Sequence, residues 1–551
     1  MKFVRPMIAA CALALGACAG STGPERHVSA AMDAGLVLRG IVVTLNDANE
    51  VIGDGRVWIQ GGRIGAVLRP ADPLPAGAIG TREVHVAGAI YPGLIDVHNH
   101  PEYAAFPLLR VTRRYADRYE WRYYDTAYTR RITNPNIVLG SADFLDLGAD
   151  MGRYGEFMAL AGGTTSLQGG GIGPSPGTTE INGRHFRPHA MPGCLVRNVE
   201  TENLTAMARS AVDVGRDLPD WERLKAAAQS GPLVLHLAEG SSRRMADEFR
   251  AIKASGLLTS NLVAVHGVGL EKTHFEDMAK AGAKLVWSPL SNFLLYGKTA
   301  DVKSARAAGV QISLAPDWAP SGSKSVLGEL KVADLVNRQA LQGLFSDQEL
   351  VRMVTRHPAE ALGWQRVAGQ ISPGYVADLV VIDARSNDVY RNLIEATERN
   401  VRATLVRGEA LYGDTALVQA IRGNADGLEP FNELLPQQKS LAALCQPADA
   451  TYREVAGRLE AALAFDGAFA LMRMGERRVA GELAKCPATV APSSPVNAAD
   501  AARMLQCRFG LPFEETPLMR LVTAGDTEYF KRLRANPNVP DYLKQLGEYY
   551  R

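Results

Sequence analysis

The sequence predicts an α/β fold built around parallel strands, and two observations carry this prediction. From residue 92 to about 365, short apolar segments of β-favouring residues alternate with helical stretches, the pattern of parallel α/β folds. Several of these segments end in a histidine or an aspartate followed closely by glycine, proline or serine. Because sites in such folds are built at the carboxyl ends of strands, the fold and a candidate site are predicted together.

Composition agrees with a large folded enzyme. The 551 residues are 46% hydrophobic and 22% charged, with a formal net charge of +1. This length exceeds one compact core, so two or three domains are expected. The near-neutral charge gives no support for nucleic-acid binding, and no apolar stretch after the N-terminus is long enough to span a bilayer.

The domains are expected in the following order. Residues 1–26 are leader and linker. Residues 27–91 alternate short β segments with Gly/Asp/Asn turns and are expected to form a β-sandwich, to which residues 366–415 also contribute. Residues 92–365 form the parallel barrel. Its strand candidates lie near 94–98, 164–168, 193–199, 233–237, 262–267, 284–288 and 310–315. An eighth is not visible, and the Gly/Pro content of 170–192 does not settle where it lies. Residues 416–551 are predicted to be a mostly helical extension.

The N-terminus has the features of an export signal. Lys2 and Arg5 precede the apolar run MIAACALALGA, which is too short for a membrane span but suits a signal peptide. The run ends in Leu-Gly-Ala-Cys18, which resembles a bacterial lipobox and implies a lipid anchor on Cys18. Ordinary cleavage after Ala19 is the alternative. Both predict an exported, periplasmic protein, and the first predicts a membrane-anchored lipoprotein.

Export bears on the cysteines. Beyond the leader the chain has Cys194, Cys445, Cys486 and Cys507, and three of them lie near the C-terminal end. An oxidising compartment permits a disulfide there, but the sequence does not choose the pair. None has the C-x-x-C spacing of a zinc or redox site, so we expect no catalytic role for them.

The segment PGLIDVHNH, residues 92–100, is the strongest local signal. It ends in His98 and His100, two positions apart. Alternate side chains of a strand leave the same face, so the two imidazoles can share one ion. Alone, an H-x-H pair is a weak signal; the apolar run before it and Asp96 strengthen it.

Three later segments add further ligand-type residues. PLVLHLAEG carries His236 and Glu239, LVAVHGVG carries His266, and VQISLAPDWAPSGS carries Asp317. Any one of these histidines could be an ordinary core or capping residue. Together they indicate a metal centre, because imidazole and carboxylate are the ligands that zinc and similar ions prefer.

These segments, in this order and spacing, resemble the amidohydrolase superfamily, especially its branch of cytosine deaminases, triazine hydrolases and imidazolonepropionase. The resemblance also covers AGGTTSLQGG, SPLSNFLLYG and GQISPGYVADLVVID, and runs from about residue 35 to 415. It implies a TIM-like (β/α)8 metal-dependent hydrolase barrel flanked by a composite β-sandwich.

The resemblance also implies the chemistry. His98, His100, His236 and Asp317 would hold one divalent ion, which lowers the pKa of its water from ~15.7 to about 7. Asp317 would be both ligand and base. Glu239 would carry the proton to the leaving nitrogen, unless it is simply a helix N-terminal acid. His266 would hydrogen-bond the nucleophile or the developing oxyanion.

The number and identity of the ions are separate questions. Binuclear relatives bridge two ions with a carboxylated lysine, but the only lysine between Gly163 and His236 is Lys225, in a helical stretch. This favours a single ion, although Glu200 or Glu202 could bridge a second. Zinc is expected, with iron and manganese as alternatives. Trp287 stands where deaminases of this branch often have histidine, which puts close deaminase identity in doubt.

The stretch 110–131 interleaves arginines with tyrosines and one tryptophan. It follows the first barrel strand, so Arg113 or Arg114 could overhang the site and pair with a substrate carboxylate. A solvated helix face is the plainer alternative. Single-stranded nucleic acid also binds such stretches, but the neutral charge and the export signal argue against it.

The sequence therefore predicts a hydrolase of a non-peptide C–N bond in a cyclic amide, an amidine or an N-acyl compound. A dipeptide or N-acyl amino acid hydrolase or a lactonase on the same barrel is one alternative, and a non-catalytic anchored binding lipoprotein is another. A small-molecule substrate is the expected partner, with membrane contact only through the lipid anchor. A homo-oligomer stays open.

Overall fold

The computed structural model describes residues 35–169, 179–181, 184–186, 195–202, 204–205, 209–213, 221–442, 450–487, 492–512 and 516–551. The predicted leader, Cys18, Cys194 and Cys445 lie outside these ranges. No helix in the described part of the chain has both the length and the apolar character needed to cross a membrane.

Eight parallel strands form the central part of the molecule, and their C-terminal ends carry the candidate site. They are β5 (Leu94–Asp96), β6 (Thr164–Leu167), β9 (Arg197–Asn198), β10 (Arg209–Asp213), β11 (Leu233–Leu237), β12 (Leu262–His266), β13 (Lys284–Trp287) and β14 (Ile312–Leu314). β5, β6 and β9 form one sheet, and β10 to β14 form a second. A parallel bridge between Asn99 and Asp317 joins the two sheets just beyond β5 and β14.

Within the described residues, no hydrogen-bond ladder joins β9 to β10, so the arrangement is TIM-barrel-like without a continuous ring. Each of the seven expected strands has a counterpart. The eighth is β10, which follows the Gly/Pro-rich stretch; the described part of that stretch holds the antiparallel pair β7 (Thr179–Ile181) and β8 (Arg184–Phe186). The apolar runs LVLHL and LVAVH are buried at every position, as parallel strands covered on both faces should be.

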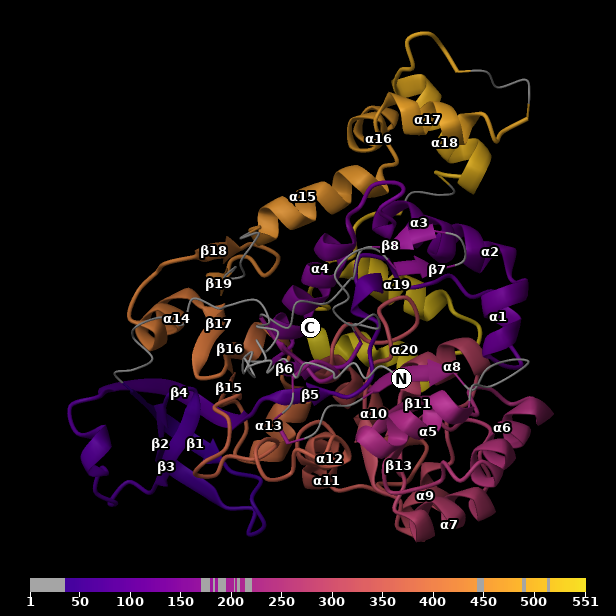
Figure 1. The fold of residues 1–551 in the computed structure, drawn as a ribbon. Coiled ribbons are helices and arrows are strands. Elements are labelled where there is room, and N and C mark those ends of the chain that lie inside the picture. The colour runs from indigo at the N-terminus through magenta and orange to yellow at the C-terminus, as the bar shows by residue number, and fades with distance from the viewer. Residues whose placement is uncertain are drawn as a thin grey trace, which may run out of the picture.

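Helices alternate with these strands and cover them (Figure 1). They are α4 (Gly148–Ala161), α5 (Trp221–Ser230), α6 (Arg243–Ala254), α7 (Lys272–Ala281), α8 (Pro289–Tyr296), α9 (Val302–Ala308), α10 (Val326–Gln339), α11 (Asp347–Arg352), α12 (Arg356–Ala361) and α13 (Val389–Glu395). Between β5 and α4 lies an insert with a 3-10 turn at Pro101–Tyr103, α1 (Arg118–Tyr124), α2 (Thr126–Tyr128), a π-helical turn at Thr129–Thr133 and α3 (Asn134–Gly140).

Beside the parallel strands lies one nine-stranded sheet, which runs along the left side of Figure 1 from β1 to β4 at the bottom up to β18 and β19. Its order is β18, β19, β17, β16, β15, β4, β1, β2 and β3. The strands are β1 (Leu36–Val43), β2 (Val51–Gln60), β3 (Arg63–Leu68), β4 (Arg82–Pro92), β15 (Leu379–Asp383), β16 (Val401–Val406), β17 (Glu409–Asp414), β18 (Leu428–Phe431) and β19 (Lys439–Ala442). The two predicted parts of the composite domain meet where β4 pairs with β15. The last two strands come from beyond the predicted limit at 415.

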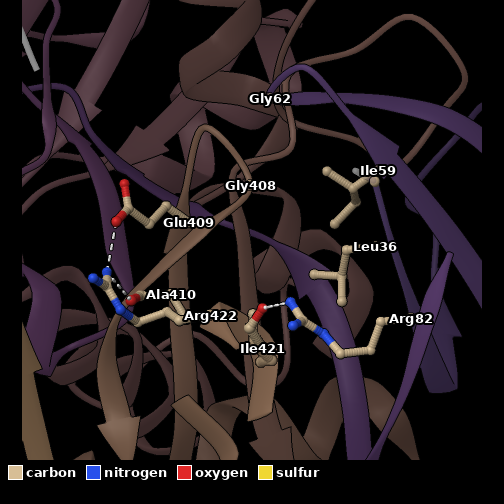
Figure 2. Close-up of a pocket in the computed structure, with 10 residues that line it drawn as sticks. Leu36, Ile59, Gly62, Arg82, Gly408, Glu409, Ala410, Ile421 and Arg422 are labelled. Atoms are coloured by element: carbon tan, nitrogen blue, oxygen red, sulfur yellow. Dashed lines mark hydrogen bonds and ion pairs between the residues drawn. The ribbon is translucent and has the colours of Figure 1, made fainter. Parts of the chain in front are cut away.

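A small pocket lies in this sheet, where β1, β2 and β17 approach α14 (Thr415–Arg422) (Figure 2). Arg422 pairs there with Glu409 at 2.5 Å, and both side chains are nearly buried, at 4% and 11% exposure. Arg82 donates to the carbonyl of Ile421 at 2.6 Å. The guanidinium groups of Arg422 and Arg82 therefore both have partners within this part of the molecule.

The described part of the C-terminal region is mostly helical. Its helices after α14 are α15 (Tyr452–Leu463), α16 (Gly467–Met474), α17 (Glu476–Leu483), α18 (Ala498–Phe509), α19 (Thr527–Ala535), α20 (Asp541–Lys544) and a final 3-10 segment at Gln545–Tyr550. A disulfide joins Cys486 to Cys507, which answers the open question of pairing. Figure 1 shows α16 to α18 projecting from the body, while α19 and α20 return to it.

Candidate metal centre

Three histidines and one aspartate meet at the C-terminal ends of the strands. One ligand atom from each of His98, His236, His266 and Asp317 lies within 4.8 Å of the other three, and all four residues are buried. They come from the ends of β5, β11, β12 and β14, so strands far apart in sequence each deliver one ligand-type side chain. The residues that the sequence singled out are therefore together in space.

His100 lies at the rim of this group. Its ring stacks on His236 with centroids 5.5 Å apart, and its Nε2 is 3.8 Å from Asp317 Oδ1. Its side chain is 30% exposed, whereas that of His98 is fully buried. The ligand set expected from the sequence contains His100, whereas the group of four found within the described residues contains His266 instead. Both sets share His98, His236 and Asp317.

The hydrogen bonds of His98 leave a lone pair pointing into the cluster. Its Nδ1 lies 3.2 Å from Gln168 Oε1, a carbonyl oxygen that only accepts, so Nδ1 is the protonated nitrogen. Its Nε2 then faces the Asp317 carboxylate at 3.0 Å. When His98 is neutral, two atoms that both carry lone pairs face each other here, and a shared cation would relieve this arrangement.

His266 is oriented in the same way. Its Nδ1 lies 3.1 Å from Asn292 Oδ1, whose amide nitrogen donates in turn to Thr299. Its buried Nε2 has no hydrogen-bond partner within the part of the chain that the structure describes. A buried imidazole nitrogen left without a partner is costly unless something binds it. Both histidines thus fit a divalent ion, each with an outer partner that fixes its tautomer.

Backbone conformation points two of these side chains inward. His266 and Asp317 have φ angles of +71° and +74°, in the left-handed region that non-glycine residues rarely adopt. Such conformations cost of order 1–3 kcal/mol each and concentrate at functional sites. Here they turn the chain at the strand ends.

Asp317 is held by two groups besides the histidines. Its Oδ2 accepts from Ser291 at 2.7 Å, and Ser291 in turn contacts Ser321, which accepts from Trp318 Nε1. Burial alone would raise the pKa of Asp317, but the surrounding histidines, with His266 first, hold this pKa below its ordinary value. The carboxylate is therefore ionised, as a metal ligand must be.

Glu239 lies beside the cluster, with its Oε2 3.6 Å from His266 Nε2. Its other oxygen accepts a hydrogen bond from Tyr296 at 2.6 Å, and the Tyr296 hydroxyl accepts from Trp121 Nε1 at 2.8 Å. Burial raises the pKa of Glu239. A carboxyl group with a raised pKa is better suited than an ordinary one to hold a proton and pass it on.

The insert after β5 fixes the loop that carries Glu239. The backbone N–H of Arg118 donates to the Glu239 carbonyl at 3.1 Å, and Asp117 bridges to Gly240. Gly240 has a φ of +136°, and a Cβ there would lie 2.4 Å from the Cα of Asp117. Only glycine permits this close approach.

A pocket opens above the cluster. It is lined by His100, Glu102, Tyr103, Arg118, Trp121, Arg122, Tyr128, His236, Glu239, Asp317 and Trp318. Trp121 and Trp318 stack with centroids 5.8 Å apart and form one aromatic wall. Burial raises the pKa of Glu102 to about 7.

The arginines of the insert divide into two groups. Arg113 forms a salt bridge with Glu120, and Arg114 lies against Gly297 at the end of α8; neither lines the pocket. Arg118 and Arg122 do line it, and Arg118 is paired with Glu248 at 2.8 Å. The insert therefore reaches the pocket through Arg118 and Arg122, and not through Arg113 or Arg114, the two arginines singled out from the sequence.

The candidates for a second metal ligand have other contacts. Lys225 lies on α5 and pairs with Glu222, away from a strand end. Glu202 pairs with Arg197 and Arg407, and Glu200 accepts from Gln168. This is in line with the single ion expected from the sequence.

The supporting residues Gln168, Ser291, Asn292, Tyr296 and Trp318 were not assigned roles from sequence. Four of them lie in segments already noted, AGGTTSLQGG and SPLSNFLLYG, and Trp318 directly follows Asp317. Their place in these segments, or next to Asp317, is the sequence signal that could have identified them.

Comparisons with known proteins agree with this geometry. A sequence model of the amidohydrolase family matches residues 226–411. The 5-methylthioadenosine/S-adenosylhomocysteine deaminase of Syntrophobacter fumaroxidans is 26% identical over 422 residues, which cover 70% of this chain and 94% of that protein. The family model and the relatives matched over most of their length support the amidohydrolase superfamily for this chain.

Solved structures show the same fold. An adenosine deaminase from Xanthomonas campestris with bound zinc has a TM-score of 0.53 at 20% identity, covering 70% of this chain and 97% of that chain. An atrazine chlorohydrolase from Arthrobacter aurescens complexed with zinc has a TM-score of 0.54 at 19% identity, covering 68% and 95%. Both of these structures contain zinc, and the His3Asp cluster of this chain could hold one metal ion.

Proposed function

We propose that this amidohydrolase is a zinc-dependent hydrolase that releases ammonia or an amine from a small cyclic compound with an amidine-like or amide carbon. One observation carries the proposal: a His3Asp cluster forms the base of an aromatic pocket, with a protonatable Glu239 beside it. Relatives named as deaminases of nucleoside compounds support the choice of an amidine-like carbon.

A divalent ion held by His98, His236 and Asp317, with His100 or His266, would supply Lewis acidity and acidify a water molecule. The protein's own groups would do the rest. Asp317 would accept the proton of the attacking water, and Glu239 would carry it to the departing nitrogen. Tyr296, by donating to Glu239 Oε1, leaves Oε2 facing the cluster.

The pocket walls support a flat, compact substrate. The cavity measures about 190 Å³, below the ~300–1,000 Å³ of typical sites for drug-sized ligands. Trp121, Trp318, Tyr103 and Tyr128 line the cavity, and aromatic side chains of this kind can stack on a planar ring.

The test is a substrate screen with purified, zinc-loaded protein. Aminopurine nucleosides, aminotriazines, cyclic amides and N-acyl amino acids are offered, and ammonia, amine and acid are measured separately. Ammonia release from an aminated ring supports the proposal. Turnover restricted to esters or lactones, or no zinc binding by the wild-type protein, would overturn it.

Arg122 on the pocket lining favours a second candidate, a hydrolase of N-acyl amino acids or dipeptides. A guanidinium group can bind a substrate carboxylate through two parallel hydrogen bonds. The same screen separates the two candidates, since this activity would release an acid and an amine without ammonia.

We also propose that the protein is exported as a lipoprotein. The leader supports this, and the Cys486–Cys507 disulfide is of the kind found in oxidising compartments. Cys18→Ala should abolish labelling by a radioactive fatty acid in cells. Labelling equal to wild type would rule out the anchor at Cys18.

A further inference from the structure

The end of the chain, residues 516–551, lies against three segments that leave the carboxyl ends of β5, β13 and β14. These are the loop 97–117, helix α8 and the loop 315–325. Between them they carry Asp317, Ser291, Tyr296 and the pocket residues Tyr103 and Trp318. The family match ends at residue 411, before this segment begins.

The contact with the loop 315–325 is a buried ion pair. The Lys324 ammonium donates to Asp526 Oδ2 at 2.6 Å and to the carbonyls of Arg520 and Val522, both at 2.8 Å. The two side chains are 0% and 8% exposed. Burying an ammonium group costs free energy unless its partners are in place. The loop is therefore stabilised in the one position in which Lys324 reaches these three oxygens.

The same loop has a second contact. Tyr529, on α19, donates to the carbonyl of Gly322 at 3.2 Å. Lys324 and Gly322 follow Asp317 by only a few residues, and Asp317 itself has the unfavourable left-handed conformation. The C-terminal segment therefore fixes the loop immediately after the carboxylate.

The loop 97–117 is held along its length. Met519 donates its backbone N–H to the Ala105 carbonyl at 3.0 Å, Arg532 donates to the Leu108 carbonyl at 3.1 Å, and Asn538 donates to the Arg113 carbonyl at 2.9 Å. All three acceptors are main-chain atoms, so these contacts set the path of the loop independently of its side chains.

Helix α8 is held at its C-terminal end. Asn538 also donates to the Leu294 carbonyl at 3.0 Å, and Asn536 reaches the same oxygen at 3.4 Å. This carbonyl belongs to the last turn of α8, two residues before Tyr296, the partner of Glu239. A single asparagine thus connects two of the three segments.

We propose that residues 516–551 act as a brace that holds the three site-bearing segments in register, with Lys324, Asp526 and Asn538 as positioning residues. The brace goes beyond the proposed function and does not depend on which substrate is hydrolysed. Its specific consequence is that loosening the brace disturbs the metal centre without unfolding the barrel.

The test uses Asp526→Asn in the full-length protein and a matched control, Glu409→Gln. The control breaks a pair of similar burial, Arg422–Glu409, in the nine-stranded sheet (Figure 2). Hydrogen exchange is followed by mass spectrometry, and zinc affinity by competition with a chelating dye. For Asp526→Asn we expect exchange in 97–117 and 315–325 to accelerate about tenfold or more, and zinc affinity to fall about tenfold. For Glu409→Gln we expect neither change.

Asn538→Ala is the second variant, in case Asp526→Asn does not fold. It removes two hydrogen bonds and no charge, and should accelerate exchange at 97–117 and in the last turn of α8. The brace would be overturned if every folded variant exchanged hydrogen at the wild-type rate in these segments. It would also be overturned if exchange became faster while zinc affinity stayed unchanged. If the wild-type protein binds no zinc, the proposed function fails and exchange alone decides the brace.

Discussion

At the scale of single residues, the site depends on hydrogen bonds that fix which atom of each side chain faces the cluster. Gln168 and Asn292 are hydrogen-bonded to the Nδ1 atoms of His98 and His266, respectively. Ser291 donates a hydrogen bond to one oxygen of Asp317. The remaining atoms, His98 Nε2, His266 Nε2 and Asp317 Oδ1, are then turned toward the cluster. Orientation is set by neighbours that bind no metal themselves.

Asp317→Asn should lower turnover by a factor on the order of 10²–10⁴, the usual contribution of an acid–base group. The amide keeps the size of the side chain but has less charge to offer a cation. Turnover, zinc content and thermal unfolding are measured on the same preparation. An active variant with normal zinc content would contradict the role of Asp317.

Tyr296→Phe removes the hydroxyl that holds Glu239. We expect kcat to fall by about tenfold or more with a small change in KM, because a hydrogen bond to a charged group is worth about 1.5–3 kcal/mol. Tyr91→Phe is the matched control: Tyr91 is also buried, and its hydroxyl donates to Val389 in a different part of the molecule. Equal losses in the two variants would show a general effect on stability.

At the scale of elements, the strands could be predicted from sequence because apolar runs and turn residues are local signals. The exception is β10, whose residues RSAVD contain two polar positions and a charged end, so no apolar run marks it. The insert was predicted to reach the site, but its choice of arginine was not predictable. Which arginine faces the pocket depends on the turn of α1 and on Glu120, which pairs with Arg113.

Helix α10 carries an element-scale prediction, since its Lys331 is completely buried. Burial lowers the pKa of Lys331 from its ordinary 10.5 to about 8. Between these values the unfolded chain binds more protons, so stability rises with pH from about 8 to about 10.5. At about 1.4 kcal/mol per pKa unit, the gain is on the order of 3 kcal/mol.

Lys331→Met should lack this rise. The measurement is urea unfolding of both proteins across this pH range, and the quantity compared is the difference in their free energies of unfolding. Parallel curves for the two proteins would mean that another group causes any rise.

At the scale of the whole molecule, the TIM-barrel-like α/β fold could be predicted, because it follows from the order of segments. The position of the C-terminal region could not. Its contacts with the loops are mostly to main-chain carbonyls, such as those of Ala105, Leu108 and Leu294, and any residue offers a carbonyl. The two strands that it adds to the sheet are short and carry little pattern.

Removal of metal is the whole-molecule prediction. Dialysis against a strong chelator should abolish hydrolysis and lower the melting temperature, since an ion that binds only the folded protein stabilises it by mass action. Added zinc should restore both. Hydrolysis that persists in protein shown to be free of metal would contradict the metal centre.

The pairing of β4 with β15 has a consequence for how the protein is made. The two strands meet from Pro92 to Gly88 on one side and from Leu379 to Asp383 on the other. During synthesis, the edge of β4 that pairs with β15 stays unpaired until all the residues between the two strands have been translated. An uncovered strand edge is a template for wrong partners, so the nascent chain is exposed to mispairing during this interval.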